Sequence, residues 1–255
     1  QIFIGCLALT ILLSSFCTYC QWKIIRRRNF IVACRGNDVK MVKEMLETDA
    51  KSKTEDNGQA QGCLTTITRK LTSLKFKMRP ELNFNERYPD GTTGLHGAAF
   101  AKHDDIVYMI ASHAQQLQIN LDFKDEDGLT GLGQYFRNVC EAGDLKNLEK
   151  ILTFTTIDFN EQDQFGQSGF FYACCKGHVQ AVKLLVQKSK SLNLDLNKAK
   201  KNGRTLTAFH IACLGKHEEI VDYLIAISEE FGINLLAEDK DGDTGYDLWR
   251  TKFKS

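Results

Sequence analysis

The chain has 255 residues, of which 43% are hydrophobic and 25% are charged, a balance that excludes wholesale disorder. Its 33 basic and 32 acidic residues give a formal charge of +1, so no global charge attracts it to nucleic acid. The charge is uneven, because residues 1–28 carry Lys23, Arg26, Arg27 and Arg28 and no acidic residue.

Residues 1–22 form an uncharged and largely apolar stretch. Roughly 20 helical residues cross a hydrocarbon core, and this stretch reaches that length. Trp22 stands where an interfacial aromatic belongs and the basic stretch 23–28 follows, which predicts a transmembrane helix with the rest of the chain in the cytoplasm. The alternatives are the apolar core of a signal peptide, the tail of a longer membrane domain, and a mis-predicted exon. Because the chain begins with Gln1 rather than Met, we expect a fragment or an incomplete gene model.

Residues 29–49 and 50–81 differ in character. The first range holds small residues followed by aliphatic ones. The second range opens with a polar stretch that predicts a loop, and apolar residues then recur with helical spacing at 64, 67, 71, 74 and 78. Basic residues but no acidic ones lie between them. Residues 64–79 therefore predict a basic amphipathic helix, which packs on its neighbours, lies on an anionic membrane, or binds a helix-grasping partner.

Residues 82–255 repeat one pattern five times. Each copy begins with an aliphatic residue and Asn or Asp, and ends in a glycine. The closing glycines are Gly91, Gly128, Gly166, Gly203 and Gly242, and their spacings of 37, 38, 37 and 39 residues are too regular for chance. A Thr or Ser, small residues, a turn and aliphatic pairs follow most of them, which predicts a loop, a short helix, a turn, a longer helix and an extended return.

This pattern resembles the ankyrin-repeat family. The family motif Asp-x-x-Gly-x-Thr-Pro-Leu-His-x-Ala-Ala-x-x-Gly-His is matched in part by Asp125–Gly128, Asp163–Gly166 and Asp239–Gly242, and by Gly91–His103, Ser168–His178 and Thr207–His217. The resemblance implies an all-α ankyrin-repeat solenoid of about six stacked helix-turn-helix units, preceded by the apolar helix 1–22. In this reading residues 29–49 are a first, degenerate repeat, 50–81 are an insert, and 82–255 are the other repeats with a C-terminal cap.

The chain departs from the family motif in three respects. Glycine or alanine replaces the proline that opens each first helix, and Gly133 and Phe171 stand where a histidine is usual. The interval from Gly128 to Gly143 is four residues longer than the family spacing, which predicts one extra helical turn. We attribute the long period of the repeats in general to lengthened second helices.

A stack of such repeats buries a continuous core and leaves an extended surface without a deep pocket. The resemblance therefore implies a non-catalytic scaffold or adaptor that binds another protein on its concave side, with no cofactor, metal or small-molecule substrate. The mixed charge of the loops favours a protein partner over nucleic acid. The expected contact residues are Tyr88, Asp90, Phe100, Asp125, Glu126, Asp127, Asp163, Gln164, Phe165, Lys176, Lys200, Lys201, Leu214, Asp239 and Asp241. The alternative is a fragment of a larger membrane protein or enzyme in which the repeats are regulatory.

The nine cysteines predict a reducing compartment rather than a disulfide framework. Those at equivalent repeat positions should be small buried residues: Cys34, Cys140, Cys174 and Cys213. Cys17 and Cys20, which lie in the apolar stretch, are candidate acylation sites.

Two residue types in the repeats suggest further roles. His96 and His210 match the structural histidine of the family, so a His210–Cys213 catalytic pair is the weaker interpretation, because no carboxylate is implied to orient the imidazole. Asparagines at the fourth position of three return segments, Asn85, Asn160 and Asn197, resemble those that cytosolic dioxygenases hydroxylate in this family.

Overall fold

The computed structural model describes residues 30–55, 83–154, 156–200 and 203–253. Within these ranges the chain is helical, and its β pairing is limited to isolated bridges between Lys124 and Thr130 and between Glu238 and Thr244. No helix in the described ranges is long and apolar enough to span a bilayer. The predicted anchor 1–22, the basic stretch 23–28 and the amphipathic helix 64–79 all lie outside the described residues.

The described residues divide into two compact units, one made of those up to residue 88 with 93–120 and the other of 89–92 with those from residue 121 onward. In the first unit, residues 30–35 are helical and are followed by α2 (Val39–Glu55), α4 (Gly94–Phe100) and α5 (Asp104–Leu117). Helix α5 packs against both α2 and α4. Helix α2 continues to Glu55, so the helix runs into the range 50–81 where a loop was expected.

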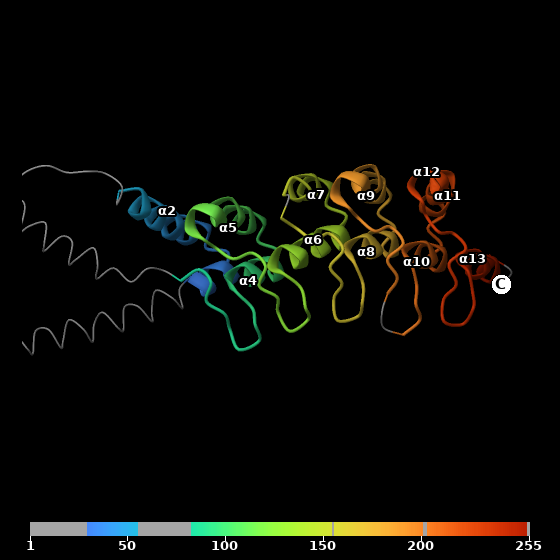
Figure 1. Ribbon diagram of the computed structural model, residues 1–255, viewed down its shortest axis with the longest axis horizontal. Coiled ribbons are helices and arrows are strands. Elements are labelled where there is room, and N and C mark those ends of the chain that lie inside the picture. The colour runs from blue at the N-terminus through green and yellow to red at the C-terminus, as the bar shows by residue number, and fades with distance from the viewer. Residues whose placement is uncertain (1–29, 56–82, 155, 201–202, 254–255) are drawn as a thin grey trace, which may run out of the picture. The chain divides into compact units, whose positions relative to one another are not determined.

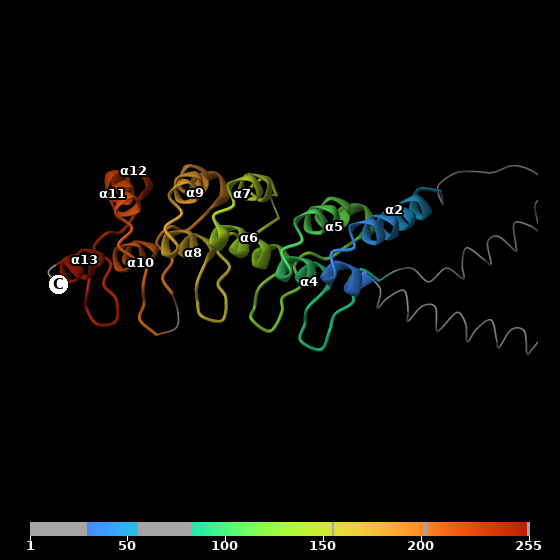
Figure 2. The same ribbon diagram turned by 180° about the vertical axis from the view of Figure 1, so that it is seen from behind.

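The second unit begins with α6 (Gly131–Ala142), α7 (Leu145–Ile151), α8 (Gly169–Cys175) and α9 (Val179–Leu192). It continues with α10 (Ala208–Leu214), α11 (Glu218–Ala226), α12 (Ser228–Phe231) and α13 (Gly245–Phe253). Figures 1 and 2 show α6, α8, α10 and α13 in one row, which we call the inner helices. Helices α7, α9, α11 and α12 form a second row, the outer helices, and the long loops project from the side of the inner row.

Helix lengths confirm one expectation and correct another. Helix α6 has 12 residues whereas α8 and α10 have 7 each, so the extra turn predicted between Gly128 and Gly143 is present. Outer helix α9 is long, with 14 residues, but α7 has only 7. In this repeat the added length lies in the first helix, not the second. The sequence after α7 contains Thr153, Thr155 and Thr156, and β-branched residues extend a helix poorly.

Three of the glycines that replace the family proline face aromatic rings. A Cβ on Gly94 would come within 2.7 Å of the Phe30 ring in the first unit. In the second unit, a Cβ on Gly169 would collide with Phe136, and one on Gly245 would collide with Phe209. The chain therefore gives up the proline at these helix starts and packs a ring from the preceding first helix into the space.

Turn histidines join neighbouring repeats. In the second unit, Nε2 of His178 lies 2.8 Å from the Glu141 carbonyl oxygen, and Nε2 of His217 lies 2.9 Å from that of Cys175. In the first unit, His103 makes the same contact with the Arg35 carbonyl oxygen at 2.9 Å. Because a carbonyl oxygen only accepts, the imidazole N–H is the donor in each case.

Candidate functional site

Three loops of the second unit are each organised by an aspartate. The carboxylate of Asp163 accepts hydrogen bonds from the backbone N–H groups of Phe165 and Gln167, both at 2.9 Å. Asp239 accepts from residues 241 and 243 in the same way, and Asp125 from residues 127 and 129. These side chains satisfy the backbone of tight turns, so the loops are held in one conformation.

Asp163 and Asp239 were expected on the contact surface, but the structure buries both side chains completely. The Asp163 carboxylate also accepts a hydrogen bond from Arg137 Nη1 and one from the Tyr172 hydroxyl, each at 2.9 Å. Burial and the hydrogen bond to Asp163 raise the pKa of Tyr172 to about 12. Both aspartates therefore act inside the protein, and neither belongs to an exposed contact surface.

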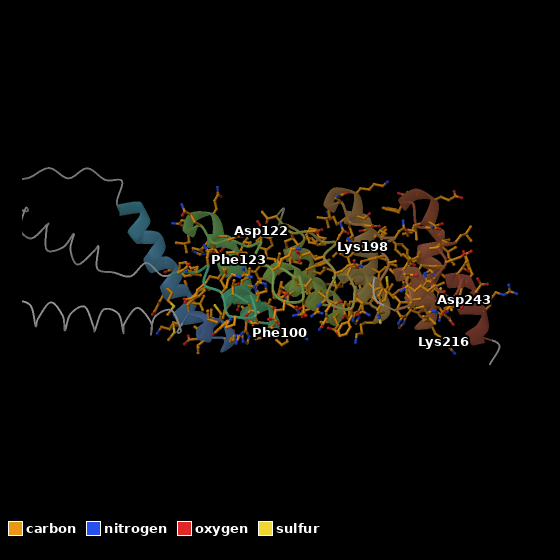
Figure 3. All side chains as sticks on the ribbon, turned by 60° about the horizontal axis from the view of Figure 1, so that its bottom comes forward. Phe100, Asp122, Phe123, Lys198, Lys216 and Asp243 are labelled. Atoms are coloured by element: carbon orange, nitrogen blue, oxygen red, sulfur yellow. The ribbon has the colours of Figure 1, made fainter. Side chains whose placement is uncertain are left out.

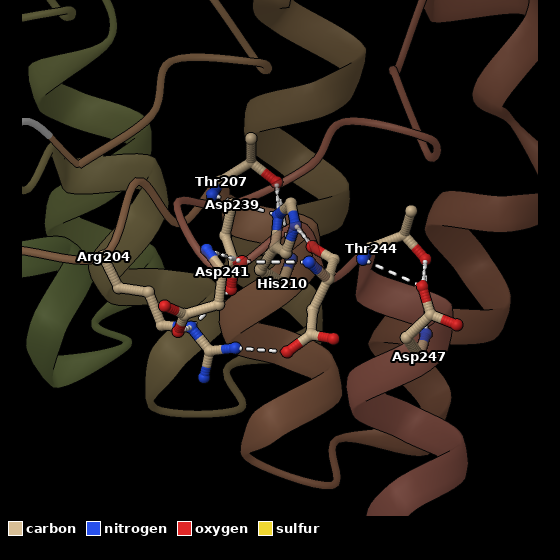
Figure 4. Close-up of polar contacts among 8 residues, drawn as sticks. Arg204, Thr207, His210, Asp239, Asp241, Thr244 and Asp247 are labelled. Atoms are coloured by element: carbon tan, nitrogen blue, oxygen red, sulfur yellow. Dashed lines mark hydrogen bonds and ion pairs between the residues drawn. The ribbon is translucent and has the colours of Figure 1, made fainter.

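Arg204 forms ion pairs with the acidic residues of the last loop (Figure 4). Its guanidinium pairs with Asp239, with Asp241 at 2.8 Å and with Asp243 at 2.6 Å. Burial raises the pKa of Asp239, but the backbone N–H groups of residues 241 and 243 and the charge of Arg204 outweigh it and hold this pKa below its ordinary value. The exposed Asp241 thus already has an intramolecular partner.

The remaining expected contact residues differ in exposure. Phe165, on the loop before α8, is 53% exposed, and Phe100, at the end of α4 in the first unit, is 77% exposed (Figure 3). The other exposed ones are Asp90, Glu126, Asp127, Gln164, Lys176 and Asp241, and the half-buried ones are Tyr88, Asp125, Lys200 and Leu214. Lys201, Cys17 and Cys20 lie outside the described residues.

Several of these side chains already have contacts within their own unit. Lys176 lies 3.3 Å from the Glu141 carboxylate, and the Arg35 guanidinium stacks 4.6 Å above the Tyr88 ring. Leu236, which sequence reasoning missed, is 74% exposed on the loop before α13. Its signal was present, since it occupies the position of Asn160 and Asn197 in the preceding return segments.

Asparagines bridge consecutive return segments. The Asn160 amide donates to the Asn193 carbonyl oxygen at 2.8 Å and its oxygen accepts from the Asp195 backbone N–H at 2.7 Å. Asn197 makes the same pair of bonds to residues 232 and 234, and in the first unit Asn85 makes them to residues 118 and 120. We call each of these an asparagine bridge. One amide therefore holds two return segments together.

Glu161 takes over the role of the missing histidine in the α6 repeat. In the repeats that keep the histidine, its Nδ1 lies within hydrogen-bonding distance of the cap Thr hydroxyl, at 2.9 Å for His96 and 2.7 Å for His210. Gly133 has no side chain to occupy the place of the histidine ring, and Glu161 Oε2 lies there instead. It accepts hydrogen bonds from Thr130 N and Thr130 Oγ1, at 3.0 Å each. Lys124 lies 3.1 Å from the other carboxylate oxygen.

The geometry disfavours a His210–Cys213 nucleophilic pair. The ring nitrogens of His210 contact the Thr207 hydroxyl and, at 3.3 Å, the Asp243 carbonyl oxygen. Burial raises the pKa of Cys213 to about 12, so its thiol stays protonated at neutral pH and is a poor nucleophile. The equivalent cysteines 34, 140 and 174 are also buried and free, as predicted. Within the described ranges, no group of His, Cys, Asp and Glu is arranged to hold a metal ion.

Comparison with known proteins agrees with this architecture. A family model described as ankyrin repeats (3 copies) matches residues 137–243. The Notch-regulated ankyrin repeat-containing protein of Xenopus tropicalis is 32% identical over 93 residues, which cover 35% of this chain and 76% of that protein. Its counterpart A from Danio rerio is also 32% identical over 93 residues and is covered to 78%. A crystal structure of an ankyrin repeat domain from Acinetobacter baumannii AYE superposes with a TM-score of 0.58 at 19% identity, covering 88% of this chain and 91% of that one.

Proposed function

Because this chain belongs to the ankyrin-repeat family, whose repeats form protein-interaction domains, we propose that it is a non-catalytic adaptor that binds another protein through the loops and inner helices of its second unit. The observation that carries the proposal is the loop of Phe165. A large aromatic side chain is exposed there on a backbone that Asp163 holds by two hydrogen bonds. Such a preorganised loop loses little entropy on binding, and exposed aromatics are frequent energetic centres of interfaces.

The charged residues of the second unit favour a protein partner. Acidic side chains at Glu126 and Asp127 and basic ones at Lys176 and Lys200 lie in the same unit. A surface of mixed charge selects a partner with a complementary pattern.

Affinity capture with matched variants tests this proposal. The full chain is immobilised, and proteins retained from a cell extract are quantified by mass spectrometry for the parent, for Phe165→Ala and for Leu145→Ala. Leu145 is 38% exposed at the start of outer helix α7, so its truncation removes apolar surface away from the proposed face. We expect Phe165→Ala to reduce retention of a specific protein at least tenfold and Leu145→Ala to leave it unchanged. Equal retention by the two variants would contradict the proposal.

We also propose that residues 1–22 tether the repeats to a membrane, with the repeats on the cytoplasmic side. The support is the uncharged stretch followed by the basic residues 23–28. Fractionation tests this directly, since a membrane-spanning chain stays with the membrane pellet in alkaline carbonate. Release of the chain into the supernatant would refute the tether without affecting the interaction proposal.

A further inference from the structure

One gap between return segments in the second unit lacks an asparagine bridge. The position equivalent to Asn85, Asn160 and Asn197 is occupied by Asp122 (Figure 3). By repeat alignment, the groups it faces on the next return segment are the Thr156 carbonyl oxygen and the Asp158 backbone N–H. An ionised carboxylate has no N–H, so Asp122 cannot donate to that carbonyl as an asparagine does.

A hollow of about 180 Å³ lies at this place. Its apolar wall is formed by Leu121, Leu132 and Ile157. The polar lining residues are Asp122, Lys124, Thr130, Thr156, Asp158 and Glu161. The hollow is much smaller than the roughly 300–1,000 Å³ of drug-sized ligand sites, so its size suits a single side chain.

The residues that line the hollow carry a net negative charge. Three of them are carboxylates, Asp122, Asp158 and Glu161, and one is a cation, Lys124, which pairs with Glu161. The net lining charge of −2 (1 − 3) favours a cationic group, and the apolar wall favours one that carries an aliphatic stem.

We infer that this hollow receives a lysine or arginine side chain from a basic segment of the partner protein, with the stem against Leu121 and Ile157 and the charged head beside Asp122 and Asp158. The inference rests on the proposed function and names the chemistry of the partner at this site. Exposed Glu126 and Asp127, on the adjoining loop, attract further basic residues of the same segment.

Replacing Asp122 by asparagine is the sharpest perturbation. Asp122→Asn removes one negative charge and supplies the amide that joins the return segments at the equivalent positions. It should therefore make the hollow both less negative and narrower. Glu229→Gln is the matched control, since it removes one negative charge from an exposed position on outer helix α12. Thermal unfolding of both variants shows whether the fold is intact, and we expect Asp122→Asn to melt at or above the temperature of the parent.

The probe is a labelled 15-residue synthetic peptide in which lysine alternates with glycine and serine, and its counterpart with glutamate for lysine. Binding to the full chain is followed by fluorescence anisotropy in 50 and 300 mM NaCl. We expect the lysine peptide to bind more weakly at the higher salt and the glutamate peptide not to bind. Asp122→Asn should weaken binding about tenfold, the change that about 1.4 kcal/mol produces, and Glu229→Gln less than twofold.

Equal effects of the two variants, binding of the glutamate peptide, or no binding of the lysine peptide would overturn the inference. A lower melting temperature of Asp122→Asn would overturn it as well, because residue 122 would then not face the bridging groups. If capture depends on Phe165 but Asp122→Asn does not change the affinity of the lysine peptide, this inference is refuted and the proposed function stands. The reverse pattern, in which peptide binding depends on Asp122 but capture does not depend on Phe165, would remove the loop of Phe165 from the proposed interaction surface and leave the cation site standing.

Discussion

Gly133 and Glu161 should be energetically coupled. The effect of Gly133→Ala on the free energy of unfolding should change sign when Glu161 is removed, which a double-mutant cycle can detect. A Cβ at position 133 would collide with Glu161 Oε2, so Gly133→Ala must push the carboxylate away from Thr130. The same substitution adds a methyl group inside helix α6, which by itself favours the helix. The outcome therefore depends on whether Glu161 is present.

The magnitude follows from the contacts that are lost. Glu161 accepts two hydrogen bonds from Thr130, and in a half-buried site these contribute about 1.5 kcal/mol each, or about 3 kcal/mol in total. The Lys124 ammonium is more than half exposed, so its ion pair contributes only about 0.5 kcal/mol. Replacing glycine by alanine in a helix gains about 1 kcal/mol. We expect Gly133→Ala to lower the free energy of unfolding by about 2 kcal/mol in the parent and to raise it by about 1 kcal/mol beside Glu161→Ala.

Urea unfolding of the full chain, followed by far-ultraviolet circular dichroism, measures all four members of the cycle. Glu149→Ala on helix α7 is the control for Glu161→Ala, since Glu149 is exposed. The coupling free energy should be about 3 kcal/mol. The reasoning is refuted when Gly133→Ala changes stability in the same direction in both backgrounds.

Two further predictions concern titration and thiol reactivity. The pKa of Asp239 is held below its unfolded value of about 3.9, so its ionised form stabilises the fold above that pH and the contribution is lost as pH falls through the folded pKa. Melting temperatures from pH 7 to pH 3 should therefore show the stability difference between the parent and Asp239→Asn shrinking below about pH 4; a constant difference would contradict this. Burial raises the pKa of Cys34 and Cys213 to about 12 and those of Cys140 and Cys174 above their ordinary range, so at pH 8 iodoacetamide should label the half-buried Cys175 before these four cysteines. Mass spectrometry of the native chain and of the chain in urea checks this, and native labelling of Cys140 would argue against it.

Periodicity predicted the helical repeats of the second unit well, because glycine and small-residue spacing report directly on local turns and close packing. The buried position of Cys140, Cys174 and Cys213 and the extra turn of α6 were both legible in this way. The short α7 was not, since the longer spacing alone does not say which helix takes the added residues.

The candidate site was harder to predict from the sequence. The aspartates of the motif were expected at the surface, but a turn aspartate can satisfy backbone N–H groups of its own loop, and Asp163 and Asp239 do so. The replacement of a histidine by Glu161 joins residues 28 positions apart (161 − 133), and no local pattern connects them. Both features depend on tertiary geometry that spacing does not encode.

The asparagine bridges also bear on how the second unit would respond to mechanical load. Asn160 and Asn197 each fasten one return segment only to the next, and the turn histidines likewise span adjacent repeats. Tension applied at the C-terminus would therefore load the last asparagine bridge, that of Asn197, first, and α13 would detach before α10 and α11. We therefore expect the repeats to unfold one at a time, each releasing roughly 130 Å of extended chain for a repeat of about 37 residues.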